Sequence, residues 1–196
     1  MLTSRFINFF LAFILLNVIV IFLVNSEVKK RKVLSFIGCI MSVMLVVSLC
    51  FFPLPMQEEL IESIKQNGEG LINNFVPFHT IVTTVWEAVK YRAWSSIIYQ
   101  LFGNIILFIP FAVSLHFYLH DSKKKRRMLI CILFLSCTIE AMQGLFNFLL
   151  GVNYRVVDID DIILNVIGGV LGGILASYAE EQFIKVVQKK KAIGAE

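Results

Sequence analysis

Apolar residues form long continuous runs along this chain, and short polar segments separate the runs. A helix that spans a bilayer needs about 20 mostly apolar residues. Five segments approach this length: Phe6–Val24, Val33–Leu54, Ile97–Leu119, Met128–Leu150 and Ile162–Tyr178. The pattern therefore predicts an all-α, multi-pass protein of the cell membrane, built as a bundle of about five transmembrane helices.

Lysine and arginine gather in alternate connections between these runs. The three basic clusters lie at residues 29–32, 123–127 and 185–191. Positive residues in short loops mark the cytoplasmic side of a membrane protein. One topology places all three clusters there, with the N-terminus outside and the C-terminus in the cytoplasm.

The longest connection, on the predicted outer side, contains two further helical patterns. Gln57–Gln66 has Leu60, Ile61 and Ile64 among charged residues, as an amphipathic surface helix does, and Ile81–Trp94 has aromatic residues suited to the membrane interface. His79 lies between them in an unusually apolar setting. We therefore divide the chain into an N-terminal two-helix hairpin, an extracellular loop, a three-helix core and a basic cytoplasmic tail, at residues 1–54, 55–96, 97–178 and 179–196.

Composition supports membrane insertion and excludes several functions. The chain is 58% hydrophobic and 16% charged, whereas soluble domains carry about 25% charged residues. The net charge of +4 comes from clusters beside apolar runs, so we expect membrane lipids as partners and no nucleic acid. The four cysteines lie in apolar runs and are interpreted as small core residues. No cofactor or metal is predicted.

Polar residues inside the apolar runs converge at the predicted outer face. Ser136, Glu140, Gln143 and Asn147 share one face of the fourth predicted helix. Such a stripe can join helices by hydrogen bonds, which suits Ser136 and Asn147. A buried carboxylate is costly and marks a functional site by default, which favours a functional role for Glu140.

The neighbouring helices bring further polar groups to the same depth. Asn104 lies in the outer half of the third predicted helix, which Pro110 is expected to kink. Asp161 and Asn165 share a face of the fifth, where four glycines allow close helix packing: Gly168, Gly169, Gly172 and Gly173.

The short connection before the fifth helix carries most of the charge. Asp158 or Asp160 could cap that helix, and Arg155 could pair with one of them or bind a carboxylate or phosphate. A divalent ion among the acids is a further possibility.

These residues together resemble the VanZ-like family of membrane proteins. The resemblance rests on four strings: Asn74-Phe-Val-Pro77-Phe, Asn104 with Phe108-Ile-Pro110-Phe, Glu140-x-x-Gln143, and Arg155-x-x-Asp158-x-Asp160-Asp161-x-x-x-Asn165-x-x-Gly168. It covers residues 70–178. The family is named for a protein that lowers the susceptibility of Gram-positive bacteria to teicoplanin, a lipid-bearing glycopeptide.

The resemblance and the polar residues suggest three functions. The first is an outward cleft that binds an amphiphile, namely teicoplanin or a lipid-linked wall precursor. Its ligand-binding residues would be Asn104, Glu140, Gln143, Arg155, Asp158, Asp160, Asp161 and Asn165. The second is an intramembrane enzyme, with Glu140 as general base and His79 as acid. The third, ranked last, is a lipid transporter, because five helices without an inverted repeat make alternating access hard to build.

Overall fold

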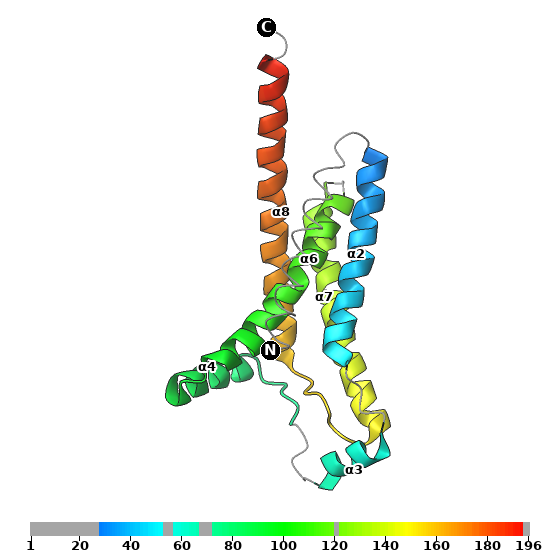
Figure 1. The fold of residues 1–196 in the computed structure, drawn as a ribbon, viewed down its shortest axis with the longest axis vertical. Helices are drawn as coiled ribbons and strands as arrows, with labels where there is room; N and C mark the ends of the chain where they lie inside the picture. Colours follow the sequence, from blue (N-terminus) through cyan, green and yellow to red (C-terminus); the bar gives the residue numbers. More distant parts are fainter. Residues whose placement is uncertain (1–27, 53–56, 67–71, 120–121, 194–196) are drawn as a thin grey trace.

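The structure is a computed structural model, and it describes residues 28–52, 57–66, 72–119 and 122–193 (Figure 1). Its elements are α2 (Val28–Phe51), α3 (Glu58–Gln66), α4 (His79–Tyr91), α5 (Trp94–Ser96), the π-helix η1 (Ile97–Phe102), α6 (Gly103–Tyr118), α7 (Lys124–Leu150) and α8 (Ile159–Ile193). The first predicted span, Phe6–Val24, lies outside the described residues.

Four helical stretches among the described residues are long and apolar enough to cross a membrane. They are Lys30–Phe51, Trp94–Tyr118, Lys124–Leu150 and Ile159–Lys189. They correspond to the second to fifth predicted spans. Large apolar side chains such as Met44, Phe134 and Ile174 are exposed on them, as expected where a helix contacts lipid. The prediction of a helical, multi-pass membrane protein is confirmed.

The last helix is longer than its apolar run. α8 has 35 residues, so at 1.5 Å per residue it is about 52 Å long, against about 30 Å for the hydrocarbon core of a bilayer. Beyond Tyr178 the sequence contains Ala, Glu, Gln and Lys without Gly or Pro before residue 194. These residues favour helix strongly, so the helix continues past the end of the membrane span.

α6 is the helix on which the bundle is built. Its most extensive contacts are with α8, and it also packs broadly against α2 (Figure 1). The main core joins α2, α6 and α7 through Val46, Phe51, Leu107, Phe108, Phe111, Ala112, Leu115, Ile132 and Ile139. A smaller cluster of Val113, Phe117 and Ala176 lies between α6 and α8.

Glycines allow α8 to approach its neighbours closely. A Cβ atom at Gly168 would overlap the Ile105 carbonyl oxygen of α6, and one at Gly172 would lie 2.7 Å from the Ile109 carbonyl oxygen. On the adjacent side, Gly169 faces the side chain of Ile132 in α7. These positions explain why α8 can pack directly on backbone.

The third span begins irregularly. Ile97–Phe102 form a π-helix, and α6 then continues through Pro110, so the irregular part precedes the residue at which the sequence predicts a kink. Before this span, α4 projects sideways from the bundle (Figure 1) and exposes Trp86 and Tyr91. It is held to η1 by a hydrogen bond of 2.8 Å from the Thr84 hydroxyl to Gln100.

The positions of the four cysteines agree only in part with the prediction that all of them are core residues. Cys39 and Cys50 pack against the core, whereas Cys131 and Cys137 are exposed on α7. The interpretation of all four as core residues is therefore wrong for these two.

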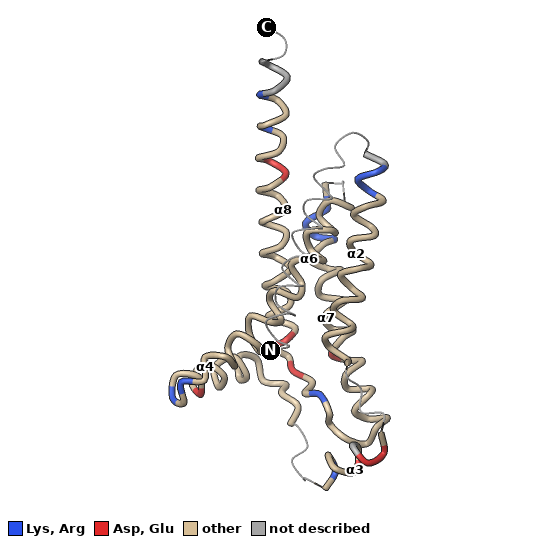
Figure 2. The backbone as a smooth tube through the Cα atoms, in the orientation of Figure 1, with Lys and Arg blue, Asp and Glu red and all other residues tan. Residues whose placement is uncertain are grey.

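Lysine and arginine gather at one end of the bundle, whereas the other end carries acids together with some cations (Figure 2). We call the end where α2 and α7 begin the basic end, because residues 30–32 and 123–127 lie there. We call the end where α7 stops and α8 starts the polar end. The acids at residues 140, 158, 160 and 161 lie toward the polar end.

We expect Gly168→Ala to destabilise the protein, because the added methyl group would overlap backbone that cannot move independently. Overpacking of this kind costs about 1–3 kcal/mol. Gly173→Ala is the matched control, since its Cβ would meet only the flexible end of Met128. Thermal unfolding in detergent should show a clear decrease for Gly168→Ala alone, and equal stability of the two variants would contradict the assigned α6–α8 contact.

Candidate functional site at the polar end

Two segments far apart in sequence lie side by side at the polar end. The Asn74 amide donates to the Val157 carbonyl at 2.9 Å, and the Ile159 amide donates to the Asn74 carbonyl at 3.0 Å. The Asn73 side-chain oxygen accepts the Val157 amide at 3.0 Å. This pairing fixes the loop before α4 against the start of α8.

Asp158 caps α8 and links it to α7. Its Oδ1 accepts the Asp160 amide and the Asn74 side-chain amide, both at 2.8 Å. Its own backbone amide donates to Glu140 Oε2 at 2.9 Å. Asp158 and Glu140 are both buried, so the two acids satisfy backbone and amide donors inside the bundle. The predicted capping role of Asp158 matches this geometry.

Asp160 caps a different helix from the one that contains it. Its Oδ1 accepts the Phe78 amide at 2.5 Å, and its Oδ2 accepts the Ile81 amide at 3.1 Å. Phe78 precedes α4 in a left-handed conformation, with φ of 66°. That conformation is unfavourable for a bulky side chain. Asp160 is fully buried, and its carboxylate stabilises both the strained residue and the positive end of α4.

The remaining predicted polar residues join helices in pairs. Asn104 of α6 donates to Asp161 of α8, and Asn165 of α8 donates to Ser136 of α7 at 2.9 Å. Gln143 reaches the Cys50 carbonyl of α2 at 3.4 Å. Each bond ties together two spans at the polar end.

Arg155 and His79 form no hydrogen bond or ion pair with these acids among the described residues. Arg155 donates to the Phe52 carbonyl at 3.1 Å, and within the described ranges it forms no ion pair. The His79 side chain is exposed at the start of α4, where it makes no hydrogen bond to another described residue. Pro77 precedes it and is also exposed.

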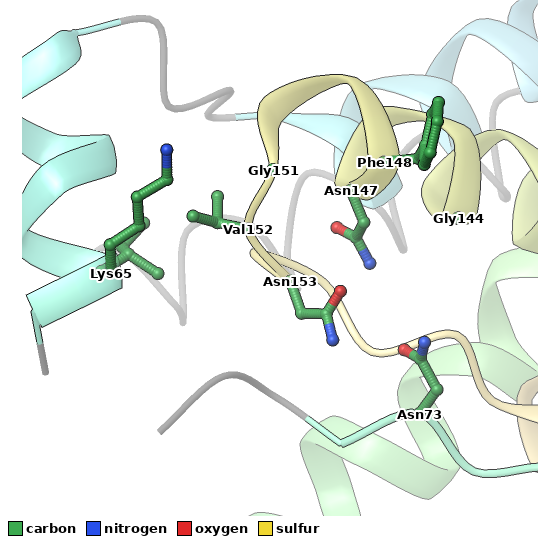
Figure 3. A pocket seen from close by; sticks show the side chains of 9 residues that line it. Lys65, Asn73, Gly144, Asn147, Phe148, Gly151, Val152 and Asn153 are labelled. Carbon is green, nitrogen blue, oxygen red and sulfur yellow. The ribbon is translucent and has the colours of Figure 1, made fainter. Parts of the chain in front are cut away.

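A cavity with a mixed polar and apolar lining lies beside this framework (Figure 3). Its volume is about 530 Å³, and it is lined by Ile64, Lys65, Asn73, Gly144, Asn147, Phe148, Gly151, Val152 and Asn153. Asn147 shapes one wall: its side chain donates to the Arg155 carbonyl at 2.6 Å and accepts the Tyr154 amide at 3.2 Å. Burial raises the pKa of the Tyr154 phenol.

Sequence reasoning missed most of this lining. Lys65, Asn73 and Asn153 were not predicted as site residues, and Asn147 was interpreted only as a link between helices. The consecutive amides Asn73 and Asn74, placed shortly before Pro77, are the signal that could have indicated a structured polar loop.

The acids do not gather as metal ligands. Among the residues that the structure describes, no group of three or more His, Cys, Asp or Glu side chains is placed to hold a metal ion. Asp158 and Asp160 instead accept backbone amides. The geometry therefore gives no support to the divalent ion considered from sequence.

The fold is that of a multi-pass helical membrane protein. At its polar end, buried acids and amides hold the loop before α4 against the start of α8, beside a cavity. The model of the VanZ/LLP1 family matches residues 36–180, most of the chain, so the protein belongs to that family, as the sequence strings indicated. Searches of curated proteins and of solved structures found no match.

We expect Asp160→Ala to loosen α4 without unfolding the bundle. The variant loses two acceptors for backbone amides, and a hydrogen bond to a charged group is worth about 1.5–3 kcal/mol. Hydrogen exchange should therefore accelerate in residues 76–84 and change little in α6. Glu87→Ala, which removes an exposed acid from α4 itself, is the control. Unchanged exchange in a folded Asp160→Ala protein would show that this carboxylate does not hold the helix.

Proposed function

We propose that this VanZ-family protein lowers susceptibility to lipid-bearing glycopeptides such as teicoplanin by binding an amphiphilic envelope ligand at its polar end. The supporting observation is the position of the cavity beside exposed apolar surface. Phe148 lines the cavity and is 82% exposed, and the adjacent Leu149 is 67% exposed. An amphiphile needs such a junction, with polar groups in the cavity and its acyl chain along the apolar surface.

The cavity chemistry suits the polar part of that ligand. Asn73 and Asn153 contribute amide groups, Lys65 contributes a cation, and Asn147 holds the backbone of the cavity wall. Amides can donate to and accept from the hydroxyl and peptide groups that glycopeptides and lipid-linked wall precursors carry. A volume of about 530 Å³ is within the range of small-molecule pockets, so we infer that it holds one polar portion of a larger ligand.

Arg155 extends this surface. It belongs to the same loop as Val152 and Asn153, and its planar guanidinium suits a carboxylate or phosphate. In this proposal Arg155 contacts an acidic group of the ligand. The buried acids Glu140, Asp158 and Asp160 hold the loop that carries it, through their bonds to backbone amides.

The predicted orientation agrees with such a ligand. The basic end opposite the cavity carries the residues that favour the cytoplasmic side, so the polar end would face the envelope, where glycopeptides act. The acid–base alternative would require His79 to act with Glu140. His79 is exposed and Glu140 is buried beneath the Asp158 amide, so we do not favour it.

We expect expression of the protein in a sensitive Gram-positive host to raise the inhibitory concentration of teicoplanin but not that of vancomycin, which lacks the acyl chain. Lys65→Ala and Arg155→Ala should each reduce this protection several-fold at matched membrane levels, because they remove cations from the proposed ligand surface. Lys189→Ala, at the far part of α8, should retain it.

Two outcomes would redirect the interpretation. No teicoplanin protection by well-expressed wild type would contradict the proposal. A changed mass of an envelope lipid that depends on Glu140, tested with Glu140→Gln, would instead favour an enzyme. Gln keeps an oxygen that can accept the Asp158 amide, so this substitution removes the charge while retaining a possible hydrogen bond.

A further inference from the structure

Before the third span enters the bundle, α4, α5 and η1 form a helical hairpin that projects sideways at the level where α8 begins (Figure 1). We call residues 79–102 the side hairpin. Its two arms are joined by the bond from the Thr84 hydroxyl to Gln100, and Asp160 of α8 holds its base through two backbone amides. The side hairpin is therefore attached to the bundle at a defined place, although most of its large apolar side chains are exposed.

The first arm, α4, has three distinct faces when its residues are placed at about 100° intervals around the helix. One face is buried toward the second arm and contains Thr84 and Ala88. The second face is apolar and exposed, and it consists of Val82, Val85, Trp86 and Val89. The third face adjoins the apolar one and is polar, with His79, Thr83, Glu87 and Lys90. Adjoining apolar and polar faces are typical of a helix that lies along the boundary between hydrocarbon and water.

Exposed apolar side chains continue along the second arm. Ile98, Tyr99 and Phe102 of η1 are each about half exposed. They belong to the stretch Trp94–Tyr118, which is long and apolar enough to cross a membrane. Lipid that surrounds the third span therefore also reaches the second arm of the side hairpin.

The start of α8 indicates the depth of the side hairpin in the membrane. From Ile159 to Tyr178, α8 is about 30 Å long at 1.5 Å per residue, which matches the hydrocarbon core of a bilayer. Asp160, which binds the base of the hairpin, is thus near one boundary of that core. Tryptophan is enriched at this boundary, and both tryptophans of the chain, Trp86 and Trp94, belong to the side hairpin.

We propose that the side hairpin docks into the leaflet at the polar end, where it lies between the phospholipid headgroups and the acyl chains. The apolar face of α4 contacts acyl chains, and the polar face contacts headgroups and water. Lys90 suits this placement, because its Nζ lies 4.3 Å from the centre of the Trp86 ring, with the cation and the amphipathic ring at one level. Since Asp160 joins the hairpin to α8, the leaflet sets the depth of the polar end independently of what the cavity binds.

Tryptophan fluorescence tests the placement directly, because Trp86 and Trp94 are the only tryptophans in the chain. The full chain is reconstituted in phosphatidylcholine vesicles whose acyl chains carry bromine either near the glycerol or near the terminal methyl group. We expect strong quenching by the shallow bromine, several-fold weaker quenching by the deep bromine, and protection from iodide in the water. Trp86→Phe and Trp94→Phe assign the signal to each arm.

Three results would overturn the proposal. Quenching by iodide but by neither lipid would place the side hairpin in water. Stronger quenching by the deep bromine would place it inside the hydrocarbon core. Protection from iodide and from both lipids would mean that protein covers the exposed face, and that protein would be a second copy of the chain if dilution with lipid restores quenching.

A matched pair of variants tests which face of α4 meets the acyl chains. In a Trp94→Phe background, Trp86 alone reports, and Val82→Asp and Thr83→Asp place the same carboxylate on the apolar and the polar face. Val82→Asp should reduce shallow quenching and increase iodide quenching several-fold, because a charge is costly in hydrocarbon. Thr83→Asp should leave both close to the background values. Equal effects of the two substitutions would contradict the assigned orientation.

Discussion

The first backbone amides of α4 and α8 have no partners within their own helices, and buried carboxylates accept some of them. Carboxylates from one short segment supply the acceptors: Asp158 for α8 and Asp160 for α4. Asp158 in turn donates its own amide to Glu140 of α7. The direction of α4, the course of the loop before it and the position of the cavity all depend on these bonds.

This arrangement explains how several acids can be buried near each other. Glu140, Asp158 and Asp160 each accept at least one backbone amide, and amides at helix starts stabilise negative charge. The same arrangement allows Phe78 to remain in a strained conformation of order 1–3 kcal/mol, because Asp160 binds its amide directly. At the polar end, the side chain of Lys65 is exposed, whereas Arg155 is half-buried and donates to the Phe52 carbonyl.

The membrane spans could be predicted from sequence because a helix that crosses a bilayer must be both long and apolar. Few other helices have both properties. The end of α8 could not be predicted, since the residues beyond Tyr178 mix charged and apolar side chains and no longer form an apolar run, so that only their helix propensity continues the helix. Similarly, the apolar pattern gave no sign of the π-helix at Ile97–Phe102, which depends on hydrogen-bond spacing and not on hydropathy.

The candidate site was only partly predictable, for a different reason. Spacing along one helix places Ser136, Glu140 and Gln143 on a common face, but it cannot specify which atom each side chain binds. Asp160 illustrates the difference, because its partners lie at Phe78 and Ile81, about 80 residues earlier in the chain. The cavity lining also combines α3, the Asn73 segment and the end of α7, and such a combination exists only after folding.

The buried or half-buried acids at the two ends of the bundle have different partners. A variant that loses function must therefore be interpreted differently at each end. At the polar end, buried acids accept rigid backbone amides, so replacing Asp158 or Asp160 alters the loop geometry before it alters any ligand contact. At the basic end, Glu180 accepts side-chain donors from three other helices, Arg31, His116 and Lys124, at 3.0–3.4 Å, so replacing it alters contacts between helices. Loss of function in an acid variant at the polar end therefore cannot by itself identify a ligand contact, whereas loss at Lys65 points more directly to the cavity, because that side chain makes no hydrogen bond to another described residue.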